Sequence, residues 1–167
     1  MLGGDPRRRL TESKMIEPGD KLPAATLEGK DGPIALAERE APLVLYFYPK
    51  DDTAGCTREA QEFSARLADF AALGVDVLGV SKDDAARHRK FSEKYDLTVP
   101  LATDDGTVME AFGVWIEKQL YGRRYMGVDR ATFLFGPDGK LVRAWRKVRV
   151  PGHVDAVLAA AKEMLGT

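Results

Sequence analysis

The fold of this chain is decided by the stretch LVLYFYPKDDTAGC, residues 43–56. Its first six residues form a continuous run of strand-forming side chains, which predicts a strand buried on both faces of a sheet. After Cys56, apolar residues recur at helical spacing as far as Gly74, where a helix stop is expected. A second run of strand formers, Val75 to Val80, follows. Strand, helix and strand form a βαβ unit, which implies parallel strands joined by a right-handed crossover.

The segments before and after this unit predict the other elements of one mixed sheet. We expect a small hairpin first, and then a second helix, a short strand, a short helix, a second hairpin and a terminal amphipathic helix. The first hairpin is predicted over 22–27 and 34–36, the second helix over 84–95, and the short strand over 99–102. The short helix is predicted over 107–112, the second hairpin over 131–135 and 141–145, and the terminal helix over 154–165. A βαβ half followed by a ββα half is the thioredoxin arrangement. The predicted fold is therefore α/β and thioredoxin-like, with a mixed central sheet, helices on both faces and an N-terminal β-hairpin.

Length and composition are those of one globular domain. The chain has 167 residues, of which 44% are apolar and 31% are charged, and its net charge is −1. That length suits a single well-buried core, and that charge gives no general attraction to nucleic acid or to an anionic membrane. No apolar run approaches the roughly 20 residues that span a bilayer. We expect one domain over 15–167, preceded by a disordered extension over 1–14, with Met15 as the original start.

Cys56 is the only cysteine in the chain, which narrows the possible chemistry. A single cysteine excludes an internal disulfide and every metal motif built from several cysteines. The two histidines, His88 and His153, are far apart in the sequence, so a histidine-built metal site is not expected. We predict His88 on a solvated helix face, His153 at the surface, and residues 50–52 in a solvated loop at the rim of the site.

The position of Cys56 at a strand-to-helix junction predicts an activated sulfur. Helix N-termini favour anions, and the thiolate is the reactive form of cysteine. Thr53, three residues earlier, carries a hydroxyl that can fold back toward the sulfur, and Pro49 can shield the pocket without offering a donor. A distant arginine would hold the sulfur ionised and bind a polar oxygen substrate. These features indicate displacement at an oxygen atom.

Residues 46–60 resemble the active-site signature of peroxiredoxins, Pro-x-x-x-Thr-x-x-Cys, and their flanks resemble the peroxiredoxin Q (bacterioferritin comigratory protein) subgroup. A second stretch, 112–118 followed by 125–133, agrees with the same subgroup, and the resemblance runs from about Met15 to Leu165. It implies a thioredoxin-like fold and the reduction of hydrogen peroxide or alkyl hydroperoxides. It implies no metal, haem or flavin cofactor.

The resemblance also assigns roles to five residues. Cys56 would be the peroxidatic cysteine, Thr53 would hydrogen-bond the sulfur and the peroxide, and Pro49 would shield the intermediate. Arg130, in the motif Gly-Val-x-Arg-x-Thr-Phe, would be the distant arginine that the chemistry requires. Glu59 would orient Arg130 through a carboxylate–guanidinium contact.

The chain departs from the subgroup at Gln61, where many members carry a resolving cysteine. Without one, the sulfenic acid formed at Cys56 must condense with an external thiol, either a low-molecular-weight thiol or a redox protein such as thioredoxin or glutaredoxin. The subgroup resemblance favours a monomer, with a dimer as the alternative. A free reactive thiol without an export signal favours the cytoplasm.

Two other functions fit the same lone cysteine. A thioredoxin-fold redox sensor or holdase, switched by oxidation of Cys56, would also use an activated thiol. The missing resolving cysteine favours this reading, whereas Thr53 and Arg130 favour turnover, because a sensor needs no optimised peroxide site. The third reading is a structural thioredoxin-like domain in which Cys56 is inert.

Overall fold

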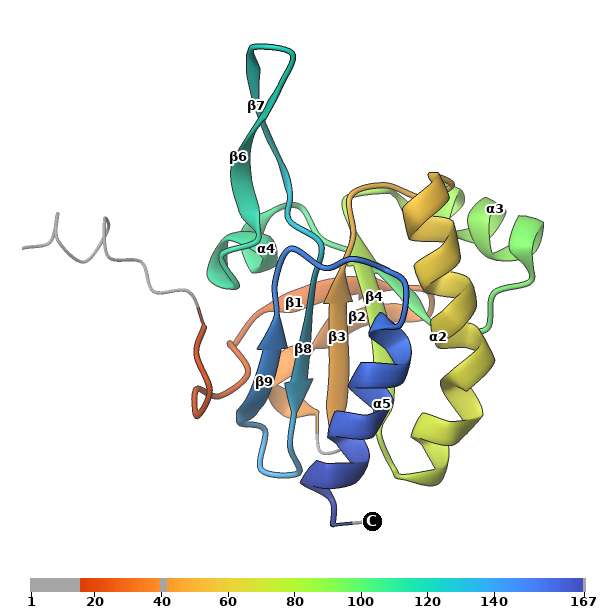
Figure 1. Ribbon diagram of the computed structural model, residues 1–167, viewed down its shortest axis with the longest axis vertical. Coiled ribbons are helices and arrows are strands. Elements are labelled where there is room, and N and C mark those ends of the chain that lie inside the picture. The colour runs from red at the N-terminus through yellow and green to blue at the C-terminus, as the bar shows by residue number, and fades with distance from the viewer. Residues whose placement is uncertain (1–15, 40–41, 167) are drawn as a thin grey trace, which may run out of the picture.

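A seven-stranded mixed sheet forms the centre of the computed structural model, which describes residues 16–39 and 42–166 (Figure 1). The strand order is β2-β1-β5-β4-β3-β8-β9. The strands are β1 (Thr26–Gly29), β2 (Gly32–Ala35), β3 (Leu43–Phe47), β4 (Asp76–Ser81), β5 (Leu101–Thr103), β8 (Ala131–Phe135) and β9 (Leu141–Trp145). The extension expected over 1–14 lies outside the described residues.

The predicted βαβ unit is confirmed at the middle of this sheet. Strand β3 pairs in parallel with β4, and β4 pairs in parallel with β5. The helices α2 (Ala54–Ala72) and α3 (Ala85–Tyr95) make the two crossovers. On its other side β3 pairs antiparallel with β8, which continues antiparallel into β9, so the predicted second hairpin is also confirmed.

Helices cover both faces of the sheet, as predicted. Helices α2, α3 and α5 (His153–Met164) lie over one face, where α2 and α5 run side by side (Figure 1). Helix α4 (Thr107–Ala111) and the short 3-10 helix η1 (Leu36–Glu38) contribute to the core on the other face. Because side chains alternate along a strand, Val44 and Tyr46 of β3 face the three helices, and Leu45 and Phe47 face α4.

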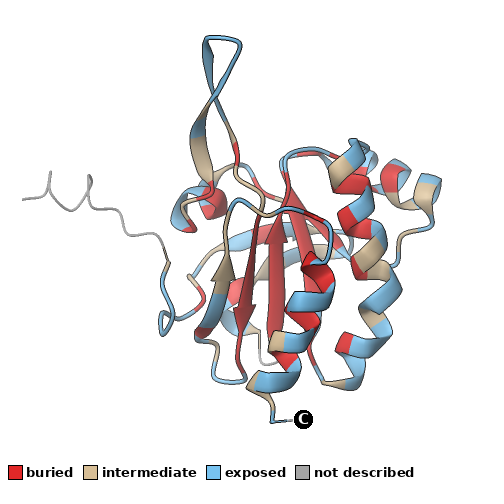
Figure 2. Cartoon of the chain, viewed as in Figure 1, coloured by how far each residue is buried: buried red, intermediate tan, exposed pale blue. Residues whose placement is uncertain are grey.

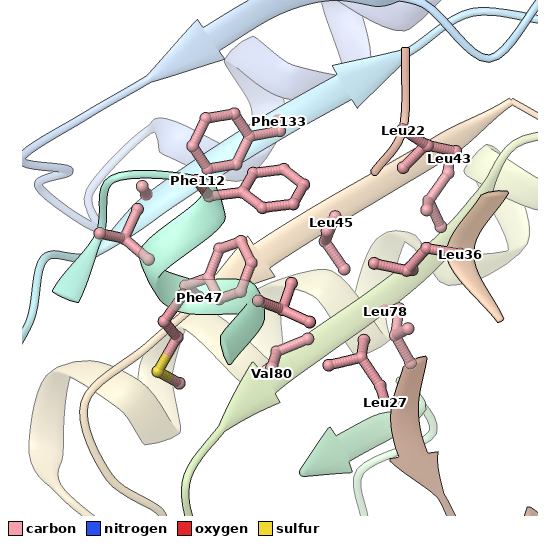
Figure 3. Close-up of a cluster of buried hydrophobic side chains, with 14 of the residues drawn as sticks. Leu22, Leu27, Leu36, Leu43, Leu45, Phe47, Leu78, Val80, Phe112 and Phe133 are labelled. Carbon is pink, nitrogen blue, oxygen red and sulfur yellow. The ribbon is translucent and has the colours of Figure 1, made fainter. Parts of the chain in front are cut away.

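The core beneath α4 is built around Phe112 (Figure 3). Its ring lies 5.1 Å from that of Phe47 and 4.8 Å from that of Phe133, both in tilted or edge-on geometry that aromatic pairs favour. Phe112 follows the last residue of α4 and is 0% exposed. This packing ties the segment that leads toward Arg130 to the end of β3, just before the cysteine loop.

The structure differs from the sequence prediction in two hairpins. The first hairpin begins at Thr26 rather than residue 22, because Leu22 packs in the core ahead of the strand. A separate hairpin of β6 (Trp115–Leu120) and β7 (Arg123–Val128) was not predicted. It projects from the body of the molecule and is largely exposed (Figures 1 and 2).

The sequence signals of the β6–β7 hairpin are weak. Its turn residues, Tyr121 and Gly122, have φ angles of 51° and 76°, a combination that hairpin turns commonly build from Asn-Gly or Gly-Gly. Nor does the hairpin show a clear apolar–polar alternation, since most of its side chains face outward. No helix among the described residues is long and apolar enough to cross a membrane.

We predict that Phe112→Ala lowers the free energy of unfolding by about 3–5 kcal/mol, because it deletes a fully buried ring and leaves a cavity. Chemical denaturation followed by fluorescence measures this loss. Val142→Ala, on β9 and 44% exposed, is the matched control and should cost under about 1 kcal/mol. Equal losses in the two variants would contradict the core described above.

Candidate active site

The cysteine loop runs from the end of β3 to the first turn of α2. It begins with a backbone hydrogen bond from Tyr48 N to Val80 O of 3.0 Å and passes through Asp52, whose φ angle is 60°. Thr53 is the N-cap of α2 in extended conformation, and Cys56 is the third residue of the helix. The sulfur therefore lies in the first turn, among backbone N–H groups without helical partners. Cys56 is buried, with 1% of its surface exposed.

Arg130 links the sulfur to a buried carboxylate. It lies between β7 and β8, and its Nη2 donates to Cys56 Sγ at 3.2 Å while its Nη1 donates to Glu59 Oε1 at 2.7 Å. The side chain of Arg130 is 17% exposed and that of Glu59 is 0% exposed. Gly55 makes this approach possible, since a Cβ atom there would lie 3.2 Å from Arg130 Nη2.

Burial sets the electrostatics of this pair. Desolvation raises the pKa of Glu59 from 4.5 to about 7, although the charge of Arg130 and its hydrogen bond act in the opposite direction. Burial also opposes the charge of Arg130, but the negative charges of Glu59 and Cys56 outweigh it and raise the pKa of the guanidinium. The site thus holds a permanently charged guanidinium against the sulfur of Cys56.

Thr53 and Pro49 lie at the exposed rim of the loop. The Thr53 hydroxyl donates to the Lys50 carbonyl oxygen at 3.0 Å, and no hydrogen bond joins it to Cys56 Sγ. As an acceptor the hydroxyl remains available to a ligand, because that bond uses only its hydrogen. Pro49 is exposed beside the loop. The structure thus brings Cys56, Arg130 and Glu59 into contact, while the roles of Thr53 and Pro49 stay predictions.

The prediction that His153 lies at the surface is wrong. His153 is 6% exposed, and its Nε2 lies 2.8 Å from Thr132 Oγ1. Its ring meets those of Phe63 and Trp145 edge-on. Burial, and then the charge of Arg130, lower its pKa from 6.5 to about 4. A signal existed in the sequence, since His153 is four residues before Val157 and so shares the apolar face of α5.

The prediction that His88 and Asp51 are solvated is also wrong. Asp51 Oδ1 accepts a hydrogen bond from Tyr48 OH at 2.6 Å, and Asp51 Oδ2 lies 2.7 Å from His88 Nδ1. The other ring nitrogen of His88 lies 3.1 Å from Ala102 O. The Asp51 backbone N–H donates to Asp83 Oδ2 at 2.8 Å. This network anchors the cysteine loop to α3, to the segment after β4 and to β5.

The neighbouring residues Lys50 and Asp52 are exposed, as predicted for a loop rim. Asp52 nevertheless has two partners on α3, Lys94 Nζ at 2.9 Å and Tyr95 OH at 2.6 Å. Together with the Asp51 network these contacts attach the loop to α3 at two successive residues. They hold in place the segment that presents Pro49 and Thr53.

Within 16–39 and 42–166, no three His, Cys, Asp or Glu side chains lie grouped as metal ligands. A cavity of about 650 Å³ lies between the β1–β2 hairpin and α3, and neither Cys56 nor Arg130 lines it.

The fold is thioredoxin-like, and it holds a lone cysteine in the first turn of a helix against an arginine that is paired with a carboxylate. This is the arrangement of a peroxide-reducing thiol enzyme. Comparison with known proteins agrees: the AhpC/TSA family matches residues 18–144. The chain belongs to this family, within the peroxiredoxin Q or bacterioferritin comigratory protein group of thiol peroxidases.

Relatives of known name and structure cover most of the chain. It is 46% identical to peroxiredoxin Bcp of Xanthomonas campestris, covering 85% of this chain and 93% of that protein, and 43% identical to peroxiredoxin Bcp of Bacillus subtilis, covering 89% and 97%. A solved structure of the Xanthomonas campestris bacterioferritin comigratory protein, studied for alkyl peroxide reduction, superposes with a TM-score of 0.82 at 43% identity, covering 89% of this chain and 99% of that chain.

The raised pKa of Glu59 predicts a characteristic dependence of stability on pH. Between pH 4.5, the ordinary pKa of a glutamate, and about pH 7, the Glu59 carboxyl group binds more protons in the folded protein than in the unfolded chain. The stabilisation that the protonated Glu59 carboxyl group gives to the folded state is therefore fully present below pH 4.5 and is lost as the pH rises through about 7. We expect the stability of the wild type, relative to Glu59→Gln, to fall by about 3 kcal/mol between these limits.

Urea denaturation of both proteins across this pH range measures the difference. Glu62→Gln is the matched control, since Glu62 is on the same helix and pairs with Arg58 at the surface at 3.0 Å. Because the charge of Glu62 is the smallest of the effects that act on the pKa of Glu59, the stability difference between Glu62→Gln and the wild type should change with pH far less than that of Glu59→Gln. A constant difference for Glu59→Gln would show that Glu59 titrates normally in the folded protein.

Proposed function

We propose that this peroxiredoxin reduces hydrogen peroxide and alkyl hydroperoxides at Cys56 and depends on an external thiol to complete each cycle. The observation that carries the proposal is the contact of Arg130 with both Cys56 Sγ and Glu59. Because Glu59 holds the guanidinium of Arg130 beside Cys56, the positive charge can stabilise both a thiolate at Cys56 and a polar oxygen of a bound peroxide. The alkyl peroxide reduction studied in the Xanthomonas campestris relative supports the substrate class.

In the proposed oxidation the Cys56 thiolate attacks one peroxide oxygen. The sulfur–oxygen bond forms as the oxygen–oxygen bond breaks, so the sulfur is oxidised to a sulfenic acid and the peroxide is reduced. The leaving oxygen takes up a proton and departs as water or an alcohol. Arg130 stabilises the negative charge that develops on this oxygen, which is the effect that preorganised donors contribute in other enzymes.

The remaining site residues have supporting roles in this proposal. Thr53, at the N-cap of α2, offers its hydroxyl oxygen to the hydrogen of the bound peroxide. Pro49 limits the access of water to the sulfur intermediate. Glu59 holds Arg130 in place and does not touch the substrate. The first two assignments rest on the signature motif and on the position of both residues in the cysteine loop.

The reduction of the sulfenic acid requires two thiol groups, which come from two small thiol molecules or from one protein that carries a dithiol. The first condenses with the sulfenic acid, releases water and forms a mixed disulfide with Cys56; the second attacks the outer sulfur, releasing Cys56 as a thiol. Gln61 stands in the position of a resolving cysteine and is exposed on α2. A low-molecular-weight thiol, thioredoxin or glutaredoxin is the proposed reductant. Because Cys56 is 1% exposed, a protein thiol reaches it only if the first turn of α2 opens.

Three further features belong to the same proposal. Residues 15–167 act as one domain, the protein works as a monomer, and it resides in the cytoplasm, where thiol reductants are kept reduced. A dimer is the alternative to the monomer. The alternative function, a redox sensor or holdase switched by Cys56, is favoured by the burial of a cysteine that has no resolving partner in the chain.

The proposed cycle predicts a single oxidation of Cys56 without thiol and continuing turnover with it. Reduced protein mixed with one equivalent of peroxide should gain the mass of one oxygen atom within seconds, and Cys56→Ser should gain nothing. Added thiol should give a transient mixed disulfide and then sustained peroxide consumption. Rapid oxidation with no turnover under any thiol would favour the sensor, and oxidation as slow as that of a free thiol would exclude peroxidase activity.

We predict that Arg130→Met slows the oxidation of Cys56 by about 100- to 1,000-fold at pH 7, the usual effect of removing one charged or hydrogen-bonding group from a transition state. Stopped-flow fluorescence with excess peroxide measures the rate. Arg124→Met is the matched control, since Arg124 is exposed on β7. A rate unchanged by Arg130→Met would remove this arginine from the mechanism.

A further inference from the structure

Two buried polar atoms beside the cysteine site have no hydrogen-bond partner. In the described part of the chain three buried side-chain atoms lack one: Tyr46 OH, Glu59 Oε2 and Arg39 Nε. Tyr46 and Glu59 are each 0% exposed and interact electrostatically with each other and, in the case of Tyr46, with Cys56. A buried hydroxyl left without a partner destabilises the folded state, and an unpaired charged oxygen destabilises it more.

The position of Tyr46 is defined by its packing. The residue is on β3, and its ring stacks on that of Phe63 at 4.4 Å and 21°. Phe63 follows Glu59 by four residues, one turn along α2, so both side chains lie on the same helix face. Gly79 of β4 leaves space for the ring, since a Cβ atom there would lie 2.6 Å from the Tyr46 hydroxyl oxygen.

The hydroxyl of Tyr46 is a hydrogen-bond donor at every pH at which the protein works. Burial, followed by the negative charges of Glu59 and Cys56, raises the pKa of Tyr46 well above its ordinary value. Glu59 Oε2, by contrast, is an acceptor whenever its carboxyl group is ionised. The two unpartnered atoms are therefore chemically complementary, one a permanent donor and the other an acceptor.

We propose that Tyr46 is a positioning residue that donates its hydroxyl hydrogen toward Glu59 Oε2 through one buried water molecule. The bridge is part of the proposal because neither atom has a direct hydrogen-bond partner, and a buried water commonly serves two to four polar groups. The bond stabilises the ionised form of Glu59, which in turn keeps Arg130 against Cys56. This inference rests on the role proposed above for Glu59 and Arg130, and it extends that role to a residue on β3.

The competing explanation is that Tyr46 is only a core aromatic residue. In that case Tyr46→Phe removes an unsatisfied hydroxyl, and such a change is neutral or stabilising. Under the proposal the same change leaves Glu59 Oε2 without its donor and disfavours the carboxylate. The two explanations therefore predict different results for the titration of Glu59: an upward shift under the proposal, and no upward shift if Tyr46 is only a core residue.

Other charged groups near Glu59 have to be separated from this effect. Arg130 and Glu62 act on Glu59 itself, and His153 of α5 lies near Arg130. Cys56 and Asp51 act on Tyr46, and Asp51 is paired with His88. With a pKa of about 4, His153 is neutral across the range of interest. Tyr48→Phe removes the hydroxyl that donates to Asp51 and so disturbs the Asp51–His88 pair. It keeps the ring that lies 5.7 Å from the ring of Tyr46. It is therefore the matched control.

The direct test is the titration of Glu59 by carbon-13 NMR of the reduced protein labelled in glutamate carboxyl groups, assigned with Glu59→Gln. A hydrogen bond to the charged form lowers a carboxyl pKa, so its loss in Tyr46→Phe should move the Glu59 midpoint upward by about one pH unit. Tyr48→Phe should leave the midpoint in place. An unmoved or lowered midpoint in Tyr46→Phe, or an equal rise in Tyr48→Phe, would overturn the proposal.

A kinetic measurement gives an independent readout. Near pH 6.5 Tyr46→Phe should oxidise about tenfold more slowly than the wild type, and the two rates should converge near pH 9, where Glu59 is ionised in both proteins. A loss of the same size at every pH would indicate a structural role only. If Arg130→Met proved to have no effect on the rate, the proposed mechanism would fail, while the NMR titration would still decide the Tyr46 link.

Discussion

The buried ion pair between Arg130 and Glu59 is the interaction on which the active site depends. A guanidinium that is 17% exposed is costly to bury alone, and the carboxylate at 2.7 Å offsets that cost. The sheet brings the pair together, because β3 and β8 are neighbours and Phe47 is paired with Ala131. The residue just before β8 therefore lies beside the loop that follows β3. One nitrogen of the guanidinium is used by Glu59, and the other is left for the sulfur.

The polar network around Asp51 supports this arrangement from the other side of the loop. Asp51 is bound by Tyr48, His88 and Asp83, so the loop is attached to elements on the side of β3 opposite to Arg130. The cysteine is thus held between two anchored segments and is almost completely buried. In the proposed cycle, a small peroxide reacts at this buried sulfur, and reduction by a larger thiol follows only after the first turn of α2 opens.

Much of this could be predicted from the sequence, and the exceptions have physical causes. The βαβ unit and the β8–β9 hairpin follow from continuous strand runs and a Pro-Asp-Gly turn. The resemblance of two separate motifs to peroxiredoxins indicated Glu59, near Cys56, and Arg130, before β8. The burial of His88 was missed because charged residues surround it in the sequence, although its spacing to Phe91 suggested a buried stripe. The local pattern gave no sign of its partner Asp51, which is 37 residues away. The β6–β7 hairpin was missed because its side chains lack the alternation of a half-buried strand.

The central claim is that Glu59 acts on Cys56 only through Arg130, and a double-mutant cycle on the rate of peroxide oxidation tests it most directly. The four proteins are the wild type, Glu59→Gln, Arg130→Met and the double variant, each reduced and mixed with excess peroxide at pH 8. The account predicts that Glu59→Gln slows the wild type by about tenfold or more but has almost no effect once Arg130 is replaced. Additive losses, with Glu59→Gln slowing both backgrounds equally, would contradict it.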